Sequence, residues 1–537
     1  MTQGRKKVCL LGICALTILA AVGFSFLRGY VAYQNKAVNK NTYFDLPPDP
    51  HTEDPLRYLD ENFVAQEGFH SNLPIVILST EGELADYKGF SDEQEYLTGE
   101  EPYIRGHISI IDGGTFDNCI TDQPVAQSAL LIKKRGHTSY SFDKEQYLIK
   151  LTTADDQKNN VDVLGMGAHD SWILNGSMAD KSMIRNYLAY RLSSEVSEVT
   201  PDSQFCEVLI QDGDQYIYQG LYLMMETVDR DDNRIPIDQF KEKNLYTSYI
   251  IRRDRFTHFD PMLETYGRLS EFSPEWIGVK YPSEARMTER AKSYIEKDFS
   301  QIEQVIYSDE ERVFDTYDKY IDVESFADYF LLNEYFGNYD AGMHSTYMYK
   351  NSGERLKIGP VWDFDQAMNN YSMDEMETGT MAFQERPFFD RLCKDARFVD
   401  LLESRFAALQ KSTLSHEHVC EVIDETSAYI RSAREREWYR WAADYYDNSG
   451  ENAHNYYLLD YRDDDNILID RFNDDYDQEI YTIKTYLYKH GRAMQTRLRL
   501  LERTTVHDSS LGNQNELFLL IIMLLFFMPS VMIVRKG

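Results

Sequence analysis

The stretch "KIGPVWDFDQAMNN", residues 357–370, joins a short apolar run to two acidic residues. The run predicts a buried strand that ends at Asp363 and Asp365. On an extended strand, residues i and i+2 project to the same side, so both carboxylates are expected to face one point. Two acids at the end of a buried strand repel each other unless a cation or basic groups compensate them. The stretch therefore predicts a site for a hard divalent cation, Mg²⁺ or Mn²⁺, shared with a phosphate-bearing substrate.

A third aspartate, Asp340, is expected in a loop between a helix at 322–338 and a strand at 345–350. In phosphoryl transfer, one loop aspartate accepts or orients the acceptor hydroxyl, and a later aspartate holds the metal on the phosphates. Asp340 is therefore a candidate catalytic residue. An ordinary turn after a helix explains its position equally well from spacing alone.

Cations in the first half of the chain are candidates for phosphate contact. Lys150 lies in the apolar strand "YLIKL", where a buried lysine is costly without an anion, and a phosphate is a natural partner. The alternative is an edge-strand lysine that discourages aggregation. Arg135 and Lys144, in the same segment, are further candidates. Arg185 and Glu226 are candidates for structural ion pairs.

The apolar periodicities predict an α+β fold in a single large domain, without internal repeats. Strands are expected over 73–80, 103–112, part of 135–153 and a hairpin at 205–229, and helices over 180–196, 288–308, 322–338 and much of 395–505.

Both ends of the chain are apolar. Residues 8–27 and 517–534 carry no charge and are each long enough to span ~30 Å of hydrocarbon as a helix. Basic residues flank both outer ends, so both termini are expected in the cytoplasm and the bulk of the chain outside the cell membrane. A cleaved signal peptide is the alternative for the first run. The expected organisation is a cytoplasmic tail at 1–7, an anchor at 8–27, a linker at 28–60, an extracytoplasmic domain at 61–505, a second span at 517–534 and a tail at 535–537.

The composition is acidic, and this excludes some classes of function. The 537 residues include 89 Asp and Glu against 56 Lys and Arg, a formal net charge of −33. A general nucleic-acid binder is expected to carry a basic face, so no nucleic-acid partner is predicted. The six cysteines show no metal-binding spacing and are too few for a disulfide scaffold, although one bridge is compatible with them.

Five stretches together resemble a known family. They are "RGHTSYSFDKEQYLIKL", "SMIRNYLAYRL", "YQGLYLMMETVDR", "NEYFGNYDAGMHSTYMYK" and "GPVWDFDQAM". Their order and approximate spacing, over roughly residues 70–450, are similar to those of the spore coat protein CotH-like kinases. The resemblance implies an atypical, minimal protein-kinase-like fold that binds ATP with a divalent metal. It also implies phosphorylation of Ser or Thr in an unknown protein substrate, such as a coat or envelope protein.

The same resemblance assigns roles to single positions. Asp340 matches the catalytic loop aspartate, Asp363 matches the metal-binding aspartate with Asp365 beside it, and Lys150 matches a basic strand residue expected to contact phosphate. The chain departs from the pattern at Ser345, where better-known members carry an asparagine. Serine is a shorter and poorer metal ligand than an amide, so Ser345 is a candidate ligand that puts strong catalysis in question.

Two other functions are compatible with these patterns. One is a weakly active or inactive module of the same fold that binds or scaffolds envelope components, which Ser345 and the scarcity of ATP outside the cytoplasm favour. The other is a metal-dependent glycosyltransferase, because D-x-D also serves metal-bound nucleotide sugars. That class would require Rossmann-like β-α units before the acids, whereas the sequence predicts strands and a hairpin.

Overall fold

The computed structural model describes residues 46–84, 103–136, 139, 142–176, 178–255, 260–269, 276–370, 378–441 and 476–504. The predicted membrane spans at 8–27 and 517–534 lie outside these residues. Within the described ranges, no helix is both long and apolar enough to cross a bilayer.

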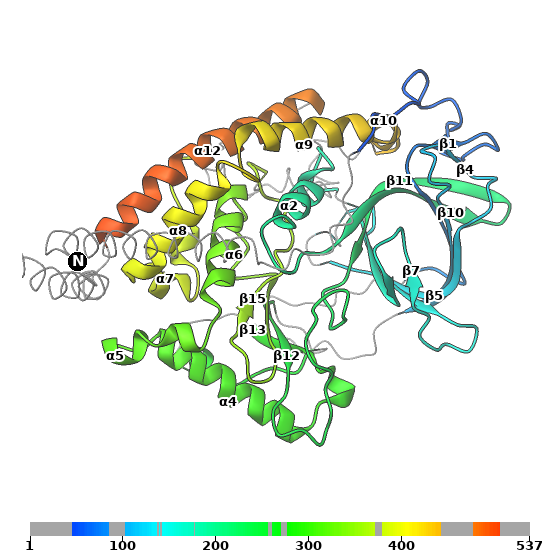
Figure 1. Ribbon diagram of the computed structural model, residues 1–537. Coiled ribbons are helices and arrows are strands. Elements are labelled where there is room, and N and C mark those ends of the chain that lie inside the picture. Colours follow the sequence, from blue (N-terminus) through cyan, green and yellow to red (C-terminus); the bar gives the residue numbers. More distant parts are fainter. Residues whose placement is uncertain are drawn as a thin grey trace, which may run out of the picture.

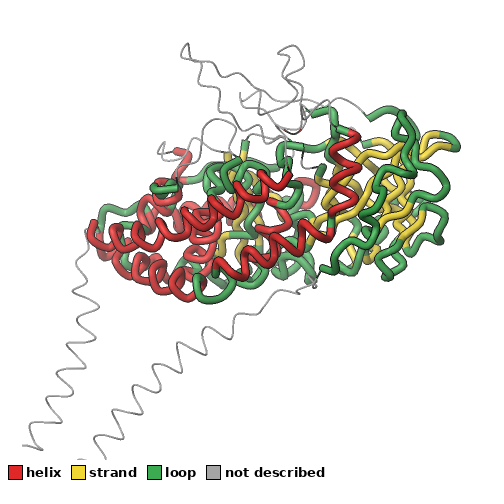
Figure 2. Tube along the Cα trace, turned by 90° about the horizontal axis from the view of Figure 1, so that it is seen from above, coloured by secondary structure: helices red, strands yellow, loops and turns green. Residues whose placement is uncertain are grey.

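The described chain has a strand-rich half and a helix-rich half that lie side by side (Figures 1 and 2). The strand-rich half is a closed barrel with the order β10-β11-β9-β6-β5-β3-β2, closed by the parallel pair β10 and β2. Its strands are β2 (Ile75–Thr80), β3 (Ile104–Ile111), β5 (Ala126–Lys134), β6 (Tyr147–Thr152), β9 (Ser171–Asn175), β10 (Ser203–Asp212) and β11 (Gln215–Glu226). Two short pairs accompany it, β1 (His70–Ser71) with β4 (Asn118–Cys119) and β7 (Val161–Asp162) with β8 (Ala168–His169).

Alternation along each barrel strand separates an inner from an outer face. On β6, Tyr147, Ile149 and Leu151 belong to the apolar cluster formed by residues of the barrel strands. Leu148 and Lys150 point the opposite way, as the period of two of a strand requires. The barrel therefore has a core of its own.

A second, antiparallel sheet lies between the barrel and the helices (Figure 1). Its order is β13 (Trp276–Tyr281), β12 (Tyr249–Asp254), β14 (Thr346–Lys350) and β15 (Lys357–Ile358). The α-helices are α2 (Arg185–Ser193), α3 (Tyr266–Leu269), α4 (Glu289–Ile306), α5 (Glu311–Phe314), α6 (Val323–Phe336), α7 (Phe389–Leu392), α8 (Ala396–Leu409), α9 (His416–Tyr429), α10 (Arg431–Arg440) and α12 (Tyr476–Thr504). Short 3₁₀ turns are η2 (Glu284–Arg286), η3 (Tyr317–Lys319) and η4 (Phe383–Glu385).

Helix α6 leads the chain into the loop that carries Asp340. Its N-terminus is capped by the Asp322 side chain, which accepts a hydrogen bond from the backbone N–H of Ser325. Its C-terminus is closed by Gly337 in the left-handed conformation, with φ of 66°. Such caps satisfy backbone groups that the helix itself leaves unbonded, so both ends of α6 are determined by local sequence.

The end of the predicted linker packs against the domain. Leu46 is buried, and the buried Asp49 carboxylate accepts a 2.6 Å hydrogen bond from the backbone N–H of Ser432 in α10. The folded unit thus includes part of the 28–60 stretch.

The α+β content, the hairpin at 205–229 and the main helices are confirmed, and two local predictions are wrong. The apolar run of residues 357–370 is a strand only to Ile358, because Gly359 has a φ of 131° and Pro360 has no N–H to donate. Helix α2 begins at Arg185, later than the predicted start at residue 180. Asp180 instead accepts hydrogen bonds from the backbone N–H groups of Ser182 and Arg185 across the preceding turn.

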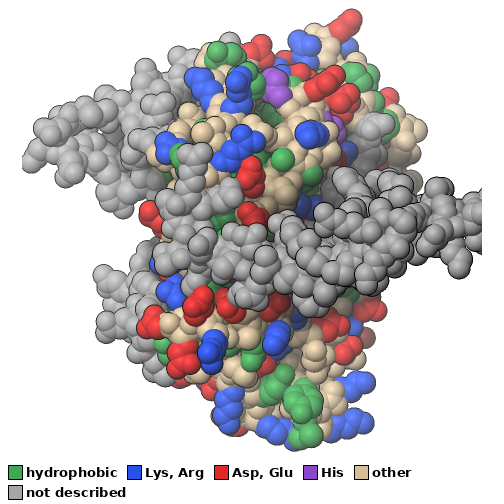
Figure 3. Space-filling view, turned by 60° about the vertical axis from the view of Figure 1, so that its left-hand side comes forward, with side chains coloured by type: hydrophobic (Ala, Val, Ile, Leu, Met, Phe, Trp, Pro, Cys, Tyr) green, Lys and Arg blue, Asp and Glu red, His purple; other side chains and the backbone are tan. Residues whose placement is uncertain are grey.

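The surface carries both signs of charge. On the face in Figure 3, Lys and Arg side chains are interspersed with Asp and Glu side chains. The four described cysteines, Cys119, Cys206, Cys393 and Cys420, are free thiols.

Candidate functional site

One pocket collects the acidic residues that the sequence indicated. Asp340, Ser345, Asp363 and Asp365 all line it. Its other walls include residues of the barrel strands β9 and β11, helix α2, the end of β12, β14 and the segment around Arg135. The pocket therefore lies where the barrel meets the second sheet.

The acidic loop, defined here as residues 361–370, has an irregular backbone. Asp363, Met368 and Asn369 have φ values of 63°, 54° and 60°, which are uncommon for residues other than glycine. The prediction that Asp363 and Asp365 project together from an extended strand is therefore wrong. They reach the same pocket through a turn instead.

The environments of Asp363 and Asp365 differ. Asp363 is exposed toward the pocket, and its Oδ2 accepts a hydrogen bond from Ser345 Oγ at 3.2 Å. Asp365 is buried, and its Oδ1 accepts a hydrogen bond from the Asn186 side-chain amide. The two acids thus offer one solvent-facing and one enclosed carboxylate to the same site.

Both carboxyl groups resist ionisation. Desolvation by the surrounding protein is the largest cause that raises the pKa of Asp363, and the nearby Asp340 carboxylate raises it further. Desolvation raises the pKa of Asp365 well above its usual range, with Asp363 and Asp180 as the next contributors. Arg135 lowers the pKa of both groups but does not cancel the rise. A bound cation would favour the ionised form of both carboxyl groups.

Asp340 lies in a tight turn after α6. Its carbonyl accepts backbone hydrogen bonds from Met343 at 3.1 Å and His344 at 2.8 Å. The turn is closed by Thr346, whose Oγ1 accepts from the backbone N–H of Gly342 at 2.7 Å. This bonding explains how the loop places Asp340 beside Ser345 at the pocket.

The described residues contain no group of three or more His, Cys, Asp or Glu side chains close enough to hold a metal. Asp363 and Asp365 therefore do not form a complete protein cage. Mg²⁺ commonly takes one or two carboxylates and completes its shell with waters and substrate phosphates. The residues present, with the Ser345 hydroxyl as a third oxygen, fit that kind of site.

The predicted cations divide into one at the pocket and two elsewhere. Arg135 lines the pocket, and its Nη1 donates to Gln146 Oε1 at 3.1 Å. Lys144 is buried, and its Nζ donates 2.7 Å hydrogen bonds to Glu437 Oε1 and to the Leu221 carbonyl. The prediction of phosphate contact by Lys144 is wrong, because its ammonium group is enclosed by an internal ion pair.

Lys150 is also absent from the described pocket lining. It lies on the outer face of β6, where its Nζ is 4.3 Å from the centroid of the Tyr103 ring. The lysine in this apolar strand is therefore accommodated by its aromatic neighbour and by partial exposure of its side chain. Arg185 and Glu226 do take part in structural ion pairs, with Asp180 and Glu479 in the first case and Arg234 in the second.

The sequence reasoning missed three pocket residues at the end of β12. Arg252 and Asp254 of β12, and Arg255 directly after it, line the same pocket as the acidic loop. Arg252 forms an ion pair with Asp260 at 2.6 Å. The signal in the sequence is the stretch "YIIRRDR", an apolar run that ends in charged residues. Residues 357–370 show the same arrangement, but there the charged residues at the end of the run are acids only.

The comparisons with known proteins agree with the motif order. The model of the family described as CotH kinase protein matches residues 132–494. A comparison with curated proteins gave no match. The matched region includes the barrel from the end of β5, the acidic loop and most of α12, which is more than half of the chain. The chain therefore belongs to the CotH kinase family.

Proposed function

We propose that the protein is a metal-dependent kinase that transfers the γ-phosphate of ATP to Ser or Thr hydroxyls of a protein. The observation that supports this most strongly is the composition of one pocket. Four carboxylates, from Asp254, Asp340, Asp363 and Asp365, share it with the guanidinium groups of Arg135, Arg252 and Arg255. A site for a nucleoside triphosphate requires carboxylates that bind the cation and guanidinium groups that bind phosphate oxygens.

The acids Asp340, Asp363 and Asp365 have two roles in this proposal. Asp363 and Asp365 hold Mg²⁺ or Mn²⁺, which when bound neutralises charge on the phosphates. Asp340 accepts a hydrogen bond from the acceptor hydroxyl and orients it toward the nucleotide. Arg135 contacts phosphate oxygens, since it is the predicted cation that lines the pocket.

Ser345 is compatible with metal binding. Its hydroxyl already contacts Asp363 Oδ2 at 3.2 Å, so it lies beside the position proposed for the cation. Serine and threonine hydroxyls hold Mg²⁺ in P-loop NTPases, where an aspartate is the companion ligand. The second candidate function, a module that binds nucleotide without transferring phosphate, is favoured by the missing asparagine at this position.

The proposal also includes the cell membrane. The apolar runs at 8–27 and 517–534 support anchoring at both ends, with the bulk of the chain on the outer side. Resistance of the full-length protein to extraction at alkaline pH, together with cleavage of residues 46–504 by external protease in intact cells, tests this arrangement.

The kinase proposal is tested with full-length protein and ATP labelled at the γ-phosphate. Wild type is expected to label itself or an added protein in Mg²⁺ or Mn²⁺. Asp363→Ala and Asp340→Ala should each lower the rate by about 100-fold or more, in line with the loss of a metal ligand or a positioned base. Lys150→Met is the matched control and should keep the rate. Nucleotide binding without any labelling would support the inactive module instead.

A further inference from the structure

The acidic loop needs support from its surroundings. Left-handed backbone at Asp363, Met368 and Asn369 persists only where neighbouring groups over-determine it. Part of this support comes from Asn338, whose side-chain amide donates to the carbonyls of Trp362 at 3.1 Å and Asp363 at 3.0 Å. These contacts support the beginning of the loop, and other residues support its second half.

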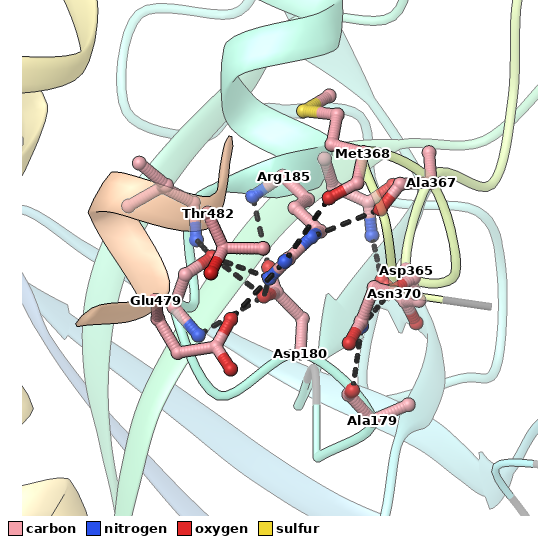
Figure 4. Close-up of polar contacts among 12 residues, drawn as sticks. Ala179, Asp180, Arg185, Asp365, Ala367, Met368, Asn370, Glu479 and Thr482 are labelled. Atoms are coloured by element: carbon pink, nitrogen blue, oxygen red, sulfur yellow. Dashed lines mark hydrogen bonds and ion pairs between the residues drawn. The ribbon is translucent and has the colours of Figure 1, made fainter. Parts of the chain in front are cut away.

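Arg185 holds the second half. It is the first residue of α2, and its side chain is completely buried. Its Nε donates to the Ala367 carbonyl at 3.0 Å and its Nη2 to the Met368 carbonyl at 3.4 Å (Figure 4). The same guanidinium group thus binds two consecutive carbonyls of the acidic loop, two and three residues after Asp365.

The guanidinium group is itself fixed by two carboxylates. Its Nη1 contacts Asp180, whose other carboxylate oxygen accepts from the backbone N–H of Arg185 at 2.8 Å. Its Nη2 pairs with Glu479 at 3.1 Å, in the first turn of α12 (Figure 4). Arg185 therefore links three parts of the chain: the turn before α2, the acidic loop and the C-terminal helix.

Two more residues of α2 contact the same loop. The Asn186 side chain accepts from the backbone N–H of Phe364 at 2.8 Å while its amide donates to Asp365. The Tyr190 hydroxyl accepts from the backbone N–H of Asp363 at 3.2 Å. Because positions four apart lie on one face of a helix, Asn186 and Tyr190 present neighbouring contacts to the loop.

We propose that Arg185 is a positioning residue that orients the acidic loop for cation binding, and that Glu479 makes α12 part of this support. The inference rests on the proposed function for the identity of the cation and nucleotide. A planar guanidinium group offers five donors in fixed directions, so it can bind two carbonyls and two carboxylates together. A lysine ammonium group at the same position keeps the charge but loses this fork.

The test compares Arg185→Lys with wild type by two measurements. In the ligand-free protein, hydrogen exchange of the amides in residues 361–370 should become at least about tenfold faster, because the loop loses its support. In calorimetry, the Mg²⁺-dependent gain in ATP affinity should fall by about tenfold, while the affinity for ATP without Mg²⁺ stays unchanged. Glu479→Gln keeps Arg185 and should show both effects at about threefold, so it serves if Arg185→Lys fails to fold.

The matched control is Arg405→Lys. Arg405 in α8 pairs with the buried Asp328 of α6 at 2.8 Å, and neither residue lines the pocket. This variant should lower the unfolding temperature without changing either measurement. Unchanged exchange and unchanged Mg²⁺ dependence in Arg185→Lys and Glu479→Gln would overturn the inference. Wild type that binds no nucleotide in Mg²⁺ would instead overturn the proposed function, and the exchange measurement would still decide the role of Arg185.

Discussion

Charges at the barrel–α10 contact and charges at the acidic loop have opposite environments. At the first, Lys144 pairs with Glu437 at 2.7 Å and Arg436 pairs with Glu207 at 2.6 Å, all four side chains being buried. At the second, Asp363 and Asp365 lie together with raised pKa values and with Asp340 nearby. The buried charges of the first region are paired with each other, whereas in the second region desolvation and neighbouring carboxylates keep the pKa values of both aspartates raised.

This difference separates structural from functional charge. The barrel backbone at Gly220 packs closely against the Lys144–Glu437 ion pair. A Cβ at Gly220, which has a φ of 118°, would lie 2.0 Å from Glu437 Oε2. No ligand can reach Lys144 there, since its ammonium group is enclosed. The acidic loop faces a pocket instead, so a cation can reach its carboxylates from outside the chain.

The largest expected effect comes from breaking the balanced pair. Lys144→Met leaves the Glu437 carboxylate buried without its cation and should lower the free energy of unfolding by about 3 kcal/mol. Urea denaturation measures this loss. The Mg²⁺-dependent ATP affinity of the folded protein should stay at the wild-type value. A large fall in that affinity would show that Lys144 takes part in nucleotide binding.

The control for this loss is an exposed pair. Arg499 on α12 pairs with Glu403 at 2.8 Å, and the Arg499 side chain is 61% exposed. Arg499→Met should change the free energy of unfolding by less than about 1 kcal/mol, because exposed ion pairs are weak.

The second expected effect is a pH dependence of cation binding. The cation binds the ionised carboxylates, and the raised pKa values of Asp363 and Asp365 mean that protons compete with it at higher pH than for ordinary aspartates. Mn²⁺ affinity should therefore fall as the pH is lowered toward these raised pKa values, by up to about tenfold per pH unit for each proton taken up. Titration calorimetry at several pH values measures this, and a flat profile would contradict the raised pKa values.

A smaller effect is expected from removing the buried charge at the acidic loop. The folded pKa of Asp365 lies above the unfolded value near 3.8, so its contribution to stability is present below that pH and is lost as pH rises through the folded pKa. Asparagine at position 365 cannot ionise, so Asp365→Asn avoids this loss of stability at high pH. The variant should raise the free energy of unfolding of the ligand-free protein at neutral pH by about 1 kcal/mol. The stabilisation of the protein by Mg²⁺ and ATP should shrink. A variant that is less stable than wild type at neutral pH would count against the raised pKa of Asp365.

The smallest effect is expected at Lys150. Its contact with the Tyr103 ring lies on the outer barrel face, away from the pocket lining. Lys150→Met should change the free energy of unfolding by less than about 1 kcal/mol and leave ATP affinity unchanged. A large loss of ATP affinity in this variant would show that the nucleotide reaches the outer face of β6.

The part of the site that follows from local sequence was predictable. Asp340 follows a helix with a clear cap and a left-handed glycine, so its place after α6 is set by adjacent residues. The apolar run before Asp363 and Asp365 marked these two acids but did not reveal the turn that brings them to the pocket. The order of strands, hairpin and helices follows from periodicity in the same way. The kinase-like architecture and the membrane spans stay predictions.

The remaining features depend on residues far apart in the chain. Lys144 finds Glu437 almost three hundred positions later, so no local pattern distinguishes it from a phosphate-binding lysine. Arg185 likewise meets Glu479 and the Ala367 carbonyl only in the folded chain. The positions of Arg252 and Arg255 were predictable from the sequence, because they lie in a charged run at the end of an apolar strand. The same feature indicated Asp363 as a site residue.

The most direct test of the central claim is a crystal structure with Mn²⁺ and a non-hydrolysable ATP analogue, in which anomalous scattering locates the metal. The account predicts one Mn²⁺ bound by carboxylate oxygens of Asp363 and Asp365 and by phosphate oxygens, with Arg135 at the phosphates. Mn²⁺ that contacts neither aspartate, or a nucleotide bound outside this pocket, would contradict it.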